Sequence, residues 1–491
     1  MELSSLTIEQ ASAGLRKKEF SSVEITEAVL KRIDSVDTNV HAYLSVLEEE
    51  AHIAAKMADE VLGRENTAGS LLGIPVALKD NMTMAGTITT SASRMLEHYR
   101  APYDGTVVSC LKKEGAVIIG KTNLDEFAMG SSTENSAFGP TSNPWDLSCV
   151  PGGSSGGSAA AVSADECIYA LGSDTGGSIR QPASLCGVVG LKPTYGQVSR
   201  YGLIAMASSL DQIGPITKTV KDAAIVFDAI KGADLRDASS ARADRKSTLG
   251  TITGDIKGLK IGVPREYFIE GMDLEIEKAT REAIEVYRSL GAEIIDVSLP
   301  HTEYALAVYY IIMPAEVSAN LARFDGVRYG FRDEDAQDLT TLYQESRRKG
   351  FGAEVRRRII LGTYTLSSGY ADAYYKKAQK VRARIEKDFA HAFTQVDCLL
   401  TPTTPALAFR KGEKSADPLT MYLEDIFTVS ANIAGVPGIS LPCGFASREG
   451  NNLPMGLQLM GKHWDEATIL NAAFSYEQAT LWHVRRPDIL S

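Results

Sequence analysis

The chain has 491 residues, 44% of them hydrophobic and 23% charged, which is enough to bury a sizeable core. Its 51 lysines and arginines against 62 aspartates and glutamates leave a net charge of −11. Such an acidic surface repels phosphate, which argues against a nucleic-acid coat or a membrane-surface protein. The six cysteines have neither Cys-x-x-Cys spacing nor histidines at zinc-ligand spacing, which predicts a reduced, cytoplasmic protein without a bound metal. Charges interrupt the apolar runs before they reach the length of a membrane span, and no secretory leader pattern is present, so we expect no membrane association.

Helical and strand patterns alternate along the chain. Residues 1–65 predict helices, because apolar residues recur at three- and four-residue spacing with charges between them. Residues 73–78 form a short apolar run that predicts a buried strand ending at Lys79, and residues 104–121 predict a helix followed by a second strand. Further strands are predicted at 168–171, 259–263, 293–297, 398–400, 439–442 and 455–460.

These patterns predict an α/β fold with a central mixed, mostly parallel twisted sheet that is covered by helices on both faces. One domain, 1–491, is expected, with an N-terminal helical region (1–65), an α/β core (66–300 and 396–491) and a helical insert (302–395). The insert is rich in tyrosine and arginine, and no flexible linker separates it from the core. The polar stretch 233–253 is the only candidate for a flexible segment.

Two loops rich in glycine and serine, at 152–158 and 172–178, are compatible with three kinds of site. A phosphate-binding loop is weakly supported, because no Lys-Ser/Thr pair follows the glycines. Residues 153–157 fit the G-x-S-x-G nucleophile elbow with Ser155 at its centre, but that motif needs a preceding strand, and loop residues stand there instead. In the third, an oxyanion nest, successive glycines let the N–H groups of residues 175–178 converge on one oxygen beside a serine hydroxyl. This last arrangement is suited to acyl transfer.

A nucleophilic serine needs a base. None of the seven histidines lies between His98 and His301, so a Ser-His-Asp triad would need a histidine that is distant in the sequence, and it remains open. Lys79, at the end of a buried strand, is the alternative, because burial lowers the pKa of a lysine until the neutral amine can accept a proton near pH 7. A second serine from the 152–158 loop could relay that proton.

Three motifs then resemble one known family. The runs PGGSSGGS at 151–158, GSDTGGSIRQPA at 172–183 and GIPVALKD at 73–80 are similar to the motifs of the amidase signature family, and the resemblance covers nearly the whole chain. Within that family the chain looks most like the glutamine-hydrolysing subunits of tRNA-dependent amidotransferases. The stretches that carry this closer resemblance lie at 123–135, 190–196, 208–215, 324–330 and 367–370.

The resemblance implies a Ser–cis-Ser–Lys triad. Ser178 would be the acyl-forming nucleophile, Ser154 the bridging serine with a non-proline cis peptide bond, and Lys79 the base. The oxyanion nest maps to the backbone of four residues, Thr175, Gly176, Gly177 and Ser178.

The resemblance also implies a glutamine pocket. Asp425 would bind the α-amino group and Arg358 the α-carboxylate, and the pocket would be lined by Tyr309, Met129 and Ser131. Simpler interpretations compete with these roles: Arg358 shares a helix with two other arginines and could lie on a solvated face or in a surface ion pair, and Asp425 could cap a helix. The basic run at 376–384 is best explained as a solvated helix face, with RNA or protein contact as the weaker interpretation.

The implied reaction is hydrolysis of glutamine to glutamate and ammonia through a covalent acyl-enzyme. By the same resemblance, the ammonia passes to a tRNA-binding kinase subunit, which uses ATP and Mg²⁺ to activate misacylated Glu-tRNA(Gln), and in some cases Asp-tRNA(Asn), while a small third subunit wraps around this chain. The tRNA would be held indirectly, through the complex, and no cofactor or metal is expected in this chain. Two rival functions are a free-standing amidase of small or aryl amides and a catalytically silent scaffold.

Overall fold

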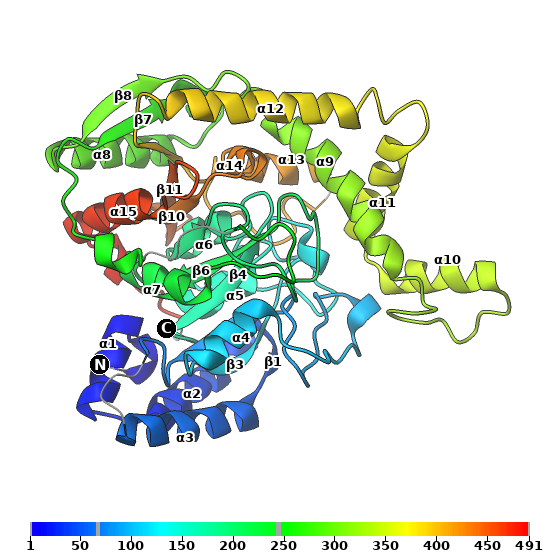
Figure 1. The fold of residues 1–491 in the computed structure, drawn as a ribbon, viewed down its shortest axis with the longest axis horizontal. Helices are drawn as coiled ribbons and strands as arrows, with labels where there is room; N and C mark the ends of the chain where they lie inside the picture. The colour runs from blue at the N-terminus through cyan, green and yellow to red at the C-terminus, as the bar shows by residue number, and fades with distance from the viewer. Residues whose placement is uncertain (1, 65–68, 242–246, 416, 490–491) are drawn as a thin grey trace.

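The computed structural model describes residues 2–64, 69–241, 247–415 and 417–489. Its centre is an 11-stranded sheet in the order β1-β3-β2-β4-β6-β5-β10-β11-β9-β7-β8 (Figure 1). The strands are β1 Tyr43–Val46, β2 Pro75–Lys79, β3 Val117–Thr122, β4 Tyr169–Asp174, β5 Val189–Lys192, β6 Gln212–Thr217, β7 Lys260–Pro264, β8 Glu293–Val297, β9 Cys398–Pro402, β10 Gly438–Arg448 and β11 Asn451–Gly461.

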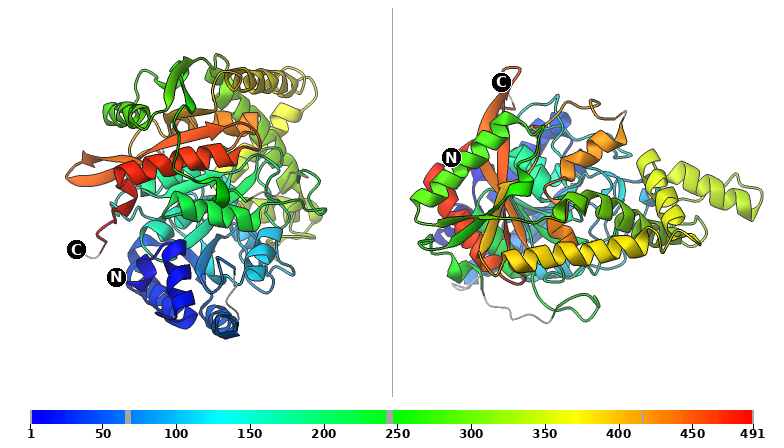
Figure 2. Two further views of the ribbon diagram at one scale, coloured as in Figure 1. Left: turned by 60° about the vertical axis from the view of Figure 1, so that its left-hand side comes forward. Right: turned by 90° about the horizontal axis from the view of Figure 1, so that it is seen from above.

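Helices pack on both faces of this sheet (Figure 2), so the predicted α/β architecture with a mixed sheet is confirmed. The helices are α1 Ile8–Lys17, α2 Ser22–Val40, α3 Glu48–Arg64, α4 Thr106–Lys113, α5 Gly156–Ser163, α6 Arg180–Cys186, α7 Val220–Ile230, α8 Leu274–Ser289, α9 Ala305–Asn320, α10 Leu339–Gly350, α11 Ala353–Leu366, α12 Tyr375–Ala392, α13 Pro418–Tyr422, α14 Val429–Ala434 and α15 Glu466–Thr480. The strands and helices predicted from periodicity are all present, with boundaries shifted by a few residues.

The expected parallel majority is wrong. Six of the ten strand pairs are antiparallel and four are parallel. Parallel neighbours need a long crossover, as α4 supplies between β2 and β3 and α8 between β7 and β8, whereas antiparallel neighbours can be joined by a tight turn. The sequence patterns did not indicate that β10 and β11 form such a hairpin, and they did not predict β1, β5 or β6. Each antiparallel pair includes at least one of these five strands.

The region 302–395 forms α9 to α12; α10 and α11 project at the right of Figure 1, and α12 runs along the top. It is mostly helical as predicted, but residues 324–338 have no regular structure and residues 367–374 form turns between α11 and α12. The segment Thr302–Arg323 is long and apolar enough to cross a membrane by length and composition, but half of it is buried inside the protein. Because α9 packs against α11, α12 and α14, it is the kind of core helix that passes the same test.

The polar stretch 233–253 contains one 3-10 turn, Leu249–Thr251, among its described residues. Residues 242–246, on which part of the predicted flexibility falls, lie outside the described residues.

Candidate active site

Lys79 is the last residue of β2, a strand that pairs with β3 on one side and β4 on the other and whose residues are all buried. The side-chain amine is therefore inside the protein, with 0% of the residue exposed. Its Nζ lies 2.7 Å from Ser154 Oγ and 2.8 Å from Ser155 Oγ, with the Ser173 carbonyl oxygen at 3.4 Å. The predicted contact between Lys79 and the bridging serine is thus present.

Burial lowers the pKa of Lys79 from 10.5 to about 7, and nearby carboxylates of Asp125, Asp174 and Asp211 oppose this shift only in part. A substantial fraction of the amine is then neutral near pH 7. Because a neutral amine can accept a proton from a hydroxyl 2.7 Å away, the geometry and the pKa agree on a base at this position.

The loop that carries Ser154 is held by buried hydrogen bonds. The Gly153–Ser154 peptide bond is cis, as the resemblance implies. Gly153 N donates to Gln181 Oε1 at 2.9 Å, and Gly156 N donates to Thr133 Oγ1 at 3.1 Å. A Cβ atom at Gly153 would lie 2.2 Å from Asp125 Oδ2, so only glycine fits this approach. The glycine-rich composition of the loop therefore reflects close packing around Ser154.

Ser178 lies in the turn between β4 and α6 and is 9% exposed. Its carbonyl oxygen accepts a hydrogen bond from Ser155 N at 3.1 Å, which ties the two serine loops together. Among the hydrogen bonds of the described residues, none joins Ser154 Oγ to Ser178 Oγ. The structure therefore brings all three predicted triad residues into one region, with the Lys79–Ser154 contact formed.

The backbone of residues 175–178 is arranged by Asp174. This carboxylate accepts hydrogen bonds from Gly177 N at 2.8 Å and Ile179 N at 3.2 Å, and it forms a buried ion pair with Arg180. Burial would raise the pKa of Asp174, but Arg180 and neighbouring donors outweigh it and lower the pKa to about 2. The carboxylate is therefore charged and holds the Gly177 amide. Among the hydrogen bonds of the described residues, none uses the backbone amides of Thr175, Gly176 or Ser178.

Tyr309, on α9, covers this turn. A Cβ atom at Gly176 would lie 2.8 Å from Tyr309 Cζ, so the ring rests on the glycine backbone. The Gly176 carbonyl oxygen accepts a hydrogen bond from Thr428 Oγ1 at 2.6 Å. The helical region 302–395 thus contacts the backbone of the predicted nest through Tyr309.

Arg358, on α11, is not on a solvated helix face, since only 2% of the residue is exposed. Its Nε donates to Glu354 Oε1 at 2.8 Å, and its guanidinium lies over the rings of Tyr310 and Tyr422 at 5.5 and 5.4 Å. Arg358 therefore does form an ion pair, but the pair is buried and does not lie on the surface as the alternative supposed.

Asp425 is buried as well, and its Oδ2 accepts a hydrogen bond from Ser131 Oγ at 2.7 Å. Burial raises the pKa of Asp425 to about 8, although Ser131 and Arg358 oppose the shift. The helix-cap alternative is wrong, because Thr428 stands at the N-cap of α14 and Asp425 lies inside a 3-10 turn. Met129 is fully buried two residues before Ser131, and among the described residues no interaction joins it to Arg358 or Asp425.

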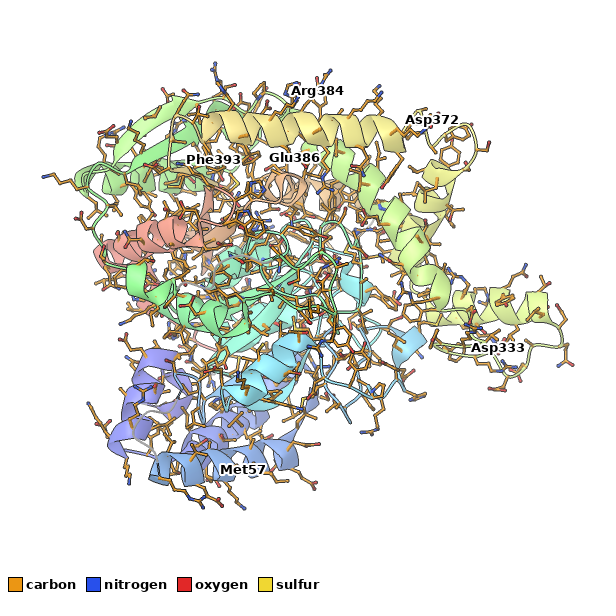
Figure 3. All side chains as sticks on the ribbon, viewed as in Figure 1. Met57, Asp333, Asp372, Arg384, Glu386 and Phe393 are labelled. Carbon is orange, nitrogen blue, oxygen red and sulfur yellow. The ribbon has the colours of Figure 1, made fainter. Side chains whose placement is uncertain are left out.

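The basic run at 376–384 lies on α12 and is mostly solvent-exposed, as predicted. Figure 3 shows Arg384 on the outer side of this helix, facing away from the sheet. Lys376 pairs with Asp372 and Arg382 with Glu386, both at the four-residue spacing of a helix surface.

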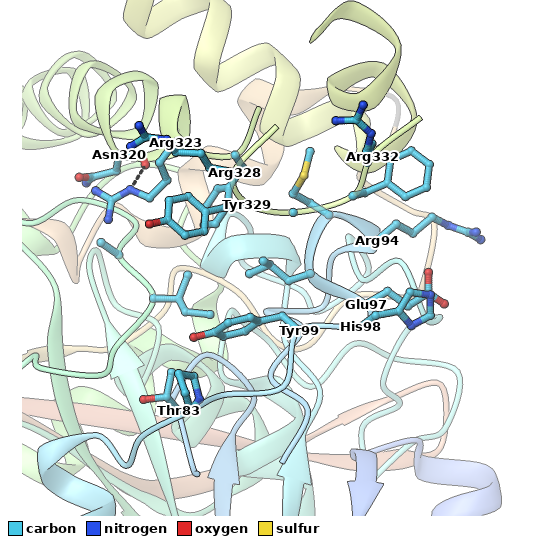
Figure 4. Close-up of a pocket in the computed structure, with 18 of the residues that line it drawn as sticks. Thr83, Arg94, Glu97, His98, Tyr99, Asn320, Arg323, Arg328, Tyr329 and Arg332 are labelled. Atoms are coloured by element: carbon cyan, nitrogen blue, oxygen red, sulfur yellow. Dashed lines mark hydrogen bonds between the residues drawn. The ribbon is translucent and has the colours of Figure 1, made fainter. Parts of the chain in front are cut away.

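A cavity of about 900 Å³ lies between the 3-10 turn η2 (Arg94–Leu96), the 202–205 loop and the irregular segment after α9 (Figure 4). None of the three triad residues lines it. One lining residue, Ile204, donates its backbone N–H to the carbonyl oxygen of Asn81, two residues after Lys79. Within the described residues, no group of three or more metal-ligand side chains is found.

Some residues of the site carry no sequence signal of their own. Asp125 and Glu126 fall in the 123–135 stretch, which marks the family but gives no role to single carboxylates. Ser155 is indicated only by the elbow motif, which has the wrong local structure. Its Oγ contacts Lys79 and also donates to the Ser173 carbonyl oxygen at 3.1 Å.

Comparison with known proteins agrees with this geometry. A family model described as Amidase matches residues 24–470. The A subunit of glutamyl-tRNA(Gln) amidotransferase from Carboxydothermus hydrogenoformans is 57% identical over 489 residues, which is 100% of each chain. The crystal structure of the same amidotransferase component from Thermotoga maritima superimposes with a TM-score of 0.82 at 44% identity, covering 100% of this chain and 99% of that one. The peptide amidase of Stenotrophomonas maltophilia gives a TM-score of 0.83 at 30% identity and 99% coverage of both chains. The chain therefore belongs to the amidase family.

Proposed function

We propose that this chain is the glutamine-hydrolysing subunit of a tRNA-dependent amidotransferase, the glutamyl-tRNA(Gln) amidotransferase. One observation carries the chemistry: a fully buried lysine amine lies 2.7 Å from the hydroxyl of Ser154, in a loop hydrogen-bonded to that of Ser178. The relatives that are 57% and 44% identical, and that carry the name of this amidotransferase, support the assignment of glutamine as the substrate.

In the proposed reaction Ser178 Oγ attacks the carboxamide carbon of glutamine. Its proton passes to Ser154, which gives its own proton to neutral Lys79. Protonated Lys79 then returns this proton through Ser154 to the nitrogen of the leaving group. The C–N bond breaks, ammonia departs, and a γ-glutamyl ester remains on Ser178. Water hydrolyses the ester by the same relay and releases glutamate.

The oxyanion of each tetrahedral intermediate would be held by backbone amides of residues 175–178. The amides of Thr175, Gly176 and Ser178 fit this role because they have no other acceptor among the described residues, whereas Gly177 N donates to Asp174. Preorganised donors of this kind stabilise the transition state because they need no rearrangement when charge develops.

The glutamine pocket would lie between Arg358 and Asp425. Arg358 would bind the α-carboxylate and Asp425 the α-ammonium group, with Tyr309, Ser131 and Met129 lining the space between them. Because the pKa of Asp425 is about 8, this carboxyl is largely protonated at pH 7 until a cation arrives. A site that pairs a buried acid with a buried arginine selects an amino acid over a simple amide.

We further propose that the chain works in a cytoplasmic heterotrimer. The tRNA-binding kinase subunit would hold tRNA, ATP and Mg²⁺ and use the ammonia to convert Glu-tRNA(Gln) to Gln-tRNA(Gln), with Asp-tRNA(Asn) as a second acceptor to be tested, and the small third subunit would complete the complex. This chain would hold no cofactor of its own and would meet tRNA only through the complex. The six cysteines, all free, support a reducing compartment.

The decisive experiment is a mass spectrum of the complex quenched during glutamine turnover. The proposed function predicts a γ-glutamyl adduct on the peptide that contains Ser178. The free-standing amidase is favoured instead if aryl amides are hydrolysed faster than glutamine and adding the other two subunits changes neither rate. The scaffold is favoured if Ser178→Ala and Lys79→Ala both leave glutamine-dependent amidation intact.

Replacing Arg358 by glutamine should raise the KM for glutamine by about 100-fold, since two charge-assisted hydrogen bonds to the α-carboxylate are lost. Arg357→Gln is the matched control, because Arg357 is the adjacent residue and pairs with the same Glu354, but its side chain is 44% exposed. Steady-state kinetics with glutamine would measure both. Equal KM changes in the two variants would contradict a binding role for Arg358.

A further inference from the structure

Glu126 is a buried carboxyl that joins two parts of the protein. It begins the 3-10 turn η3, Glu126–Ala128, shortly after β3, and 3% of the residue is exposed. Its Oε2 accepts a hydrogen bond from Gly352 N at 2.8 Å, and its Oε1 is hydrogen-bonded to Ser93 Oγ. Gly352 is the residue immediately before α11, so the carboxyl connects the core to the start of that helix.

Ser93 strengthens the same connection. Its Oγ also donates to the carbonyl oxygen of Gly350, the last residue of α10, at 3.1 Å. Glu126 and Ser93 therefore hold both ends of the α10–α11 junction. The fit at Gly352 is close, because a Cβ atom there would lie 2.3 Å from Glu126 Oε2.

Aromatic rings pack beside this connection. The ring of Phe127 lies 5.4 Å from that of Phe324, in the segment after α9, and 5.7 Å from that of Phe351, at the junction itself. Phe127 adopts the left-handed conformation, with φ at 50°, which non-glycine residues seldom do. A backbone held in this way, with its ring packed against the helical region, leaves Glu126 little freedom to move away from Gly352.

The two elements that meet at Glu126 lead to opposite ends of the proposed glutamine pocket. Six residues after Gly352, α11 carries Arg358, and five residues after Glu126, the loop carries Ser131, whose hydroxyl holds Asp425. Any shift between Glu126 and Gly352 would change the separation of the two groups that are proposed to bind the ends of the substrate.

We propose that Glu126 is a positioning residue for glutamine, which fixes the start of α11 against the 126–131 loop and thereby sets the spacing between Arg358 and Asp425. This inference rests on the proposed function. Glu126 itself would not touch the substrate, because its two oxygens are taken by Gly352 and Ser93.

The hydrogen-bond pattern distinguishes two substitutions. Ser93 has one hydroxyl proton, and if it goes to the Gly350 carbonyl, Ser93 Oγ must accept a proton from position 126. A protonated carboxyl can supply it, and burial raises the pKa of Glu126 to about 7. Glutamine can supply it as well, through Nε2, while its Oε1 accepts from Gly352 N. Alanine can do neither, and it leaves the buried Gly352 N–H without an acceptor, whereas the Ser93 hydroxyl keeps the Gly350 carbonyl oxygen.

The test compares Glu126→Ala with Glu126→Gln in the assembled complex. We expect Glu126→Ala to raise the KM for glutamine about tenfold, the usual effect of losing one such hydrogen bond, with kcat changed less than about threefold. Glu126→Gln should restore the wild-type KM. In a Ser178→Ala background, where no turnover occurs, calorimetry should show the same tenfold change in the Kd for glutamine.

Two controls separate positioning from general destabilisation. Asp222→Ala removes another buried carboxyl, one that accepts hydrogen bonds from Ile8 N and Glu9 N far from the site, and it should lower the melting temperature without changing KM. Gly352 has a φ of −68°, a backbone conformation that alanine tolerates. The Cβ atom added by Gly352→Ala should therefore act only through its contact with Glu126. Gly352→Ala should raise KM, and adding it to Glu126→Ala should cause no further rise.

The proposal is overturned if Glu126→Ala leaves KM and Kd unchanged, if Glu126→Gln is as impaired as Glu126→Ala, or if only kcat falls. Propionamide, which lacks both charged ends of glutamine, should show no change in KM in any of these variants, and an equal change with propionamide would also count against positioning. If the wild-type complex hydrolyses propionamide but not glutamine, the proposed function fails instead, so the two failures are distinguishable.

Discussion

Ser178→Ala is expected to abolish glutamine hydrolysis, with a fall in kcat of about 10⁴- to 10⁶-fold, the range found when a serine nucleophile is removed. Its loop is held by backbone contacts, including the hydrogen bond from Ser155 N to the Ser178 carbonyl oxygen, and not by the hydroxyl. The substitution should therefore leave the fold and the affinity for glutamine nearly unchanged. Ammonia release in steady state and calorimetric titration with glutamine would measure the two quantities.

Ser155→Ala is the matched control for this prediction. Ser155 Oγ touches Lys79, but it also donates to the Ser173 carbonyl oxygen and accepts from Ser173 N, so its bonds are those of a structural side chain. We expect a loss of less than about tenfold in kcat, the scale of one disturbed hydrogen bond. If Ser155→Ala were as severe as Ser178→Ala while Ser154→Ala were mild, the bridging role would belong to Ser155.

The second large effect concerns Lys79. Because the neutral amine is the proposed base and its pKa is about 7, kcat/KM should be low in acid and rise with pH through a midpoint near 7. Lys79→Ala should lower the rate by about 10³- to 10⁴-fold and remove this midpoint. The pH profile is best measured with propionamide, because Asp425, with a pKa of about 8, also gains charge as pH rises and would strengthen binding of the glutamine ammonium group.

Lys192 offers a control of unusual similarity. It ends strand β5 as Lys79 ends β2, it is 1% exposed, and burial likewise lowers its pKa to about 7. Its Nζ, however, donates to the Pro193 carbonyl oxygen and contacts no serine hydroxyl among the described residues. Lys192→Met should alter stability and keep the pH midpoint. A midpoint that moved with Lys192 and not with Lys79 would contradict the proposed base.

Much of the fold could be predicted because local pattern reflects local environment. The 73–78 run consists of small and branched apolar residues, which suits a strand buried on both faces, and β2 is such a strand. The direction of strand pairing could not be predicted in this way. Strand β5 has only four residues. Its partners, β6 and β10, lie far along the chain, and the spacing of neighbouring residues carries no information about such distant pairing.

The same distinction applies to the residues of the site, because some could be predicted from the local pattern and others could not. Lys79 and the two glycine-serine loops could be singled out from residue type and spacing, because a buried strand end and a run of glycines each restrict what a residue can do. The residue pattern alone could not separate Arg358 from Arg357, since both stand in one helix, and only the family resemblance pointed to Arg358. Burial distinguishes them, as only 2% of Arg358 is exposed.

The sequence by itself determined the alternation of strands and helices, the glycine-lined loops around two serines, and the membership of a family whose motifs those loops share. Only the tertiary structure showed that the hydroxyls of both Ser154 and Ser155 contact the buried amine. It also showed that Asp174 holds the Gly177 amide and that Glu126 contacts the residue before α11. The physical reason is that these contacts join segments from different elements, in one case 226 residues apart. Their strength depends on exclusion from water, which is a property of the folded interior and not of any stretch of chain.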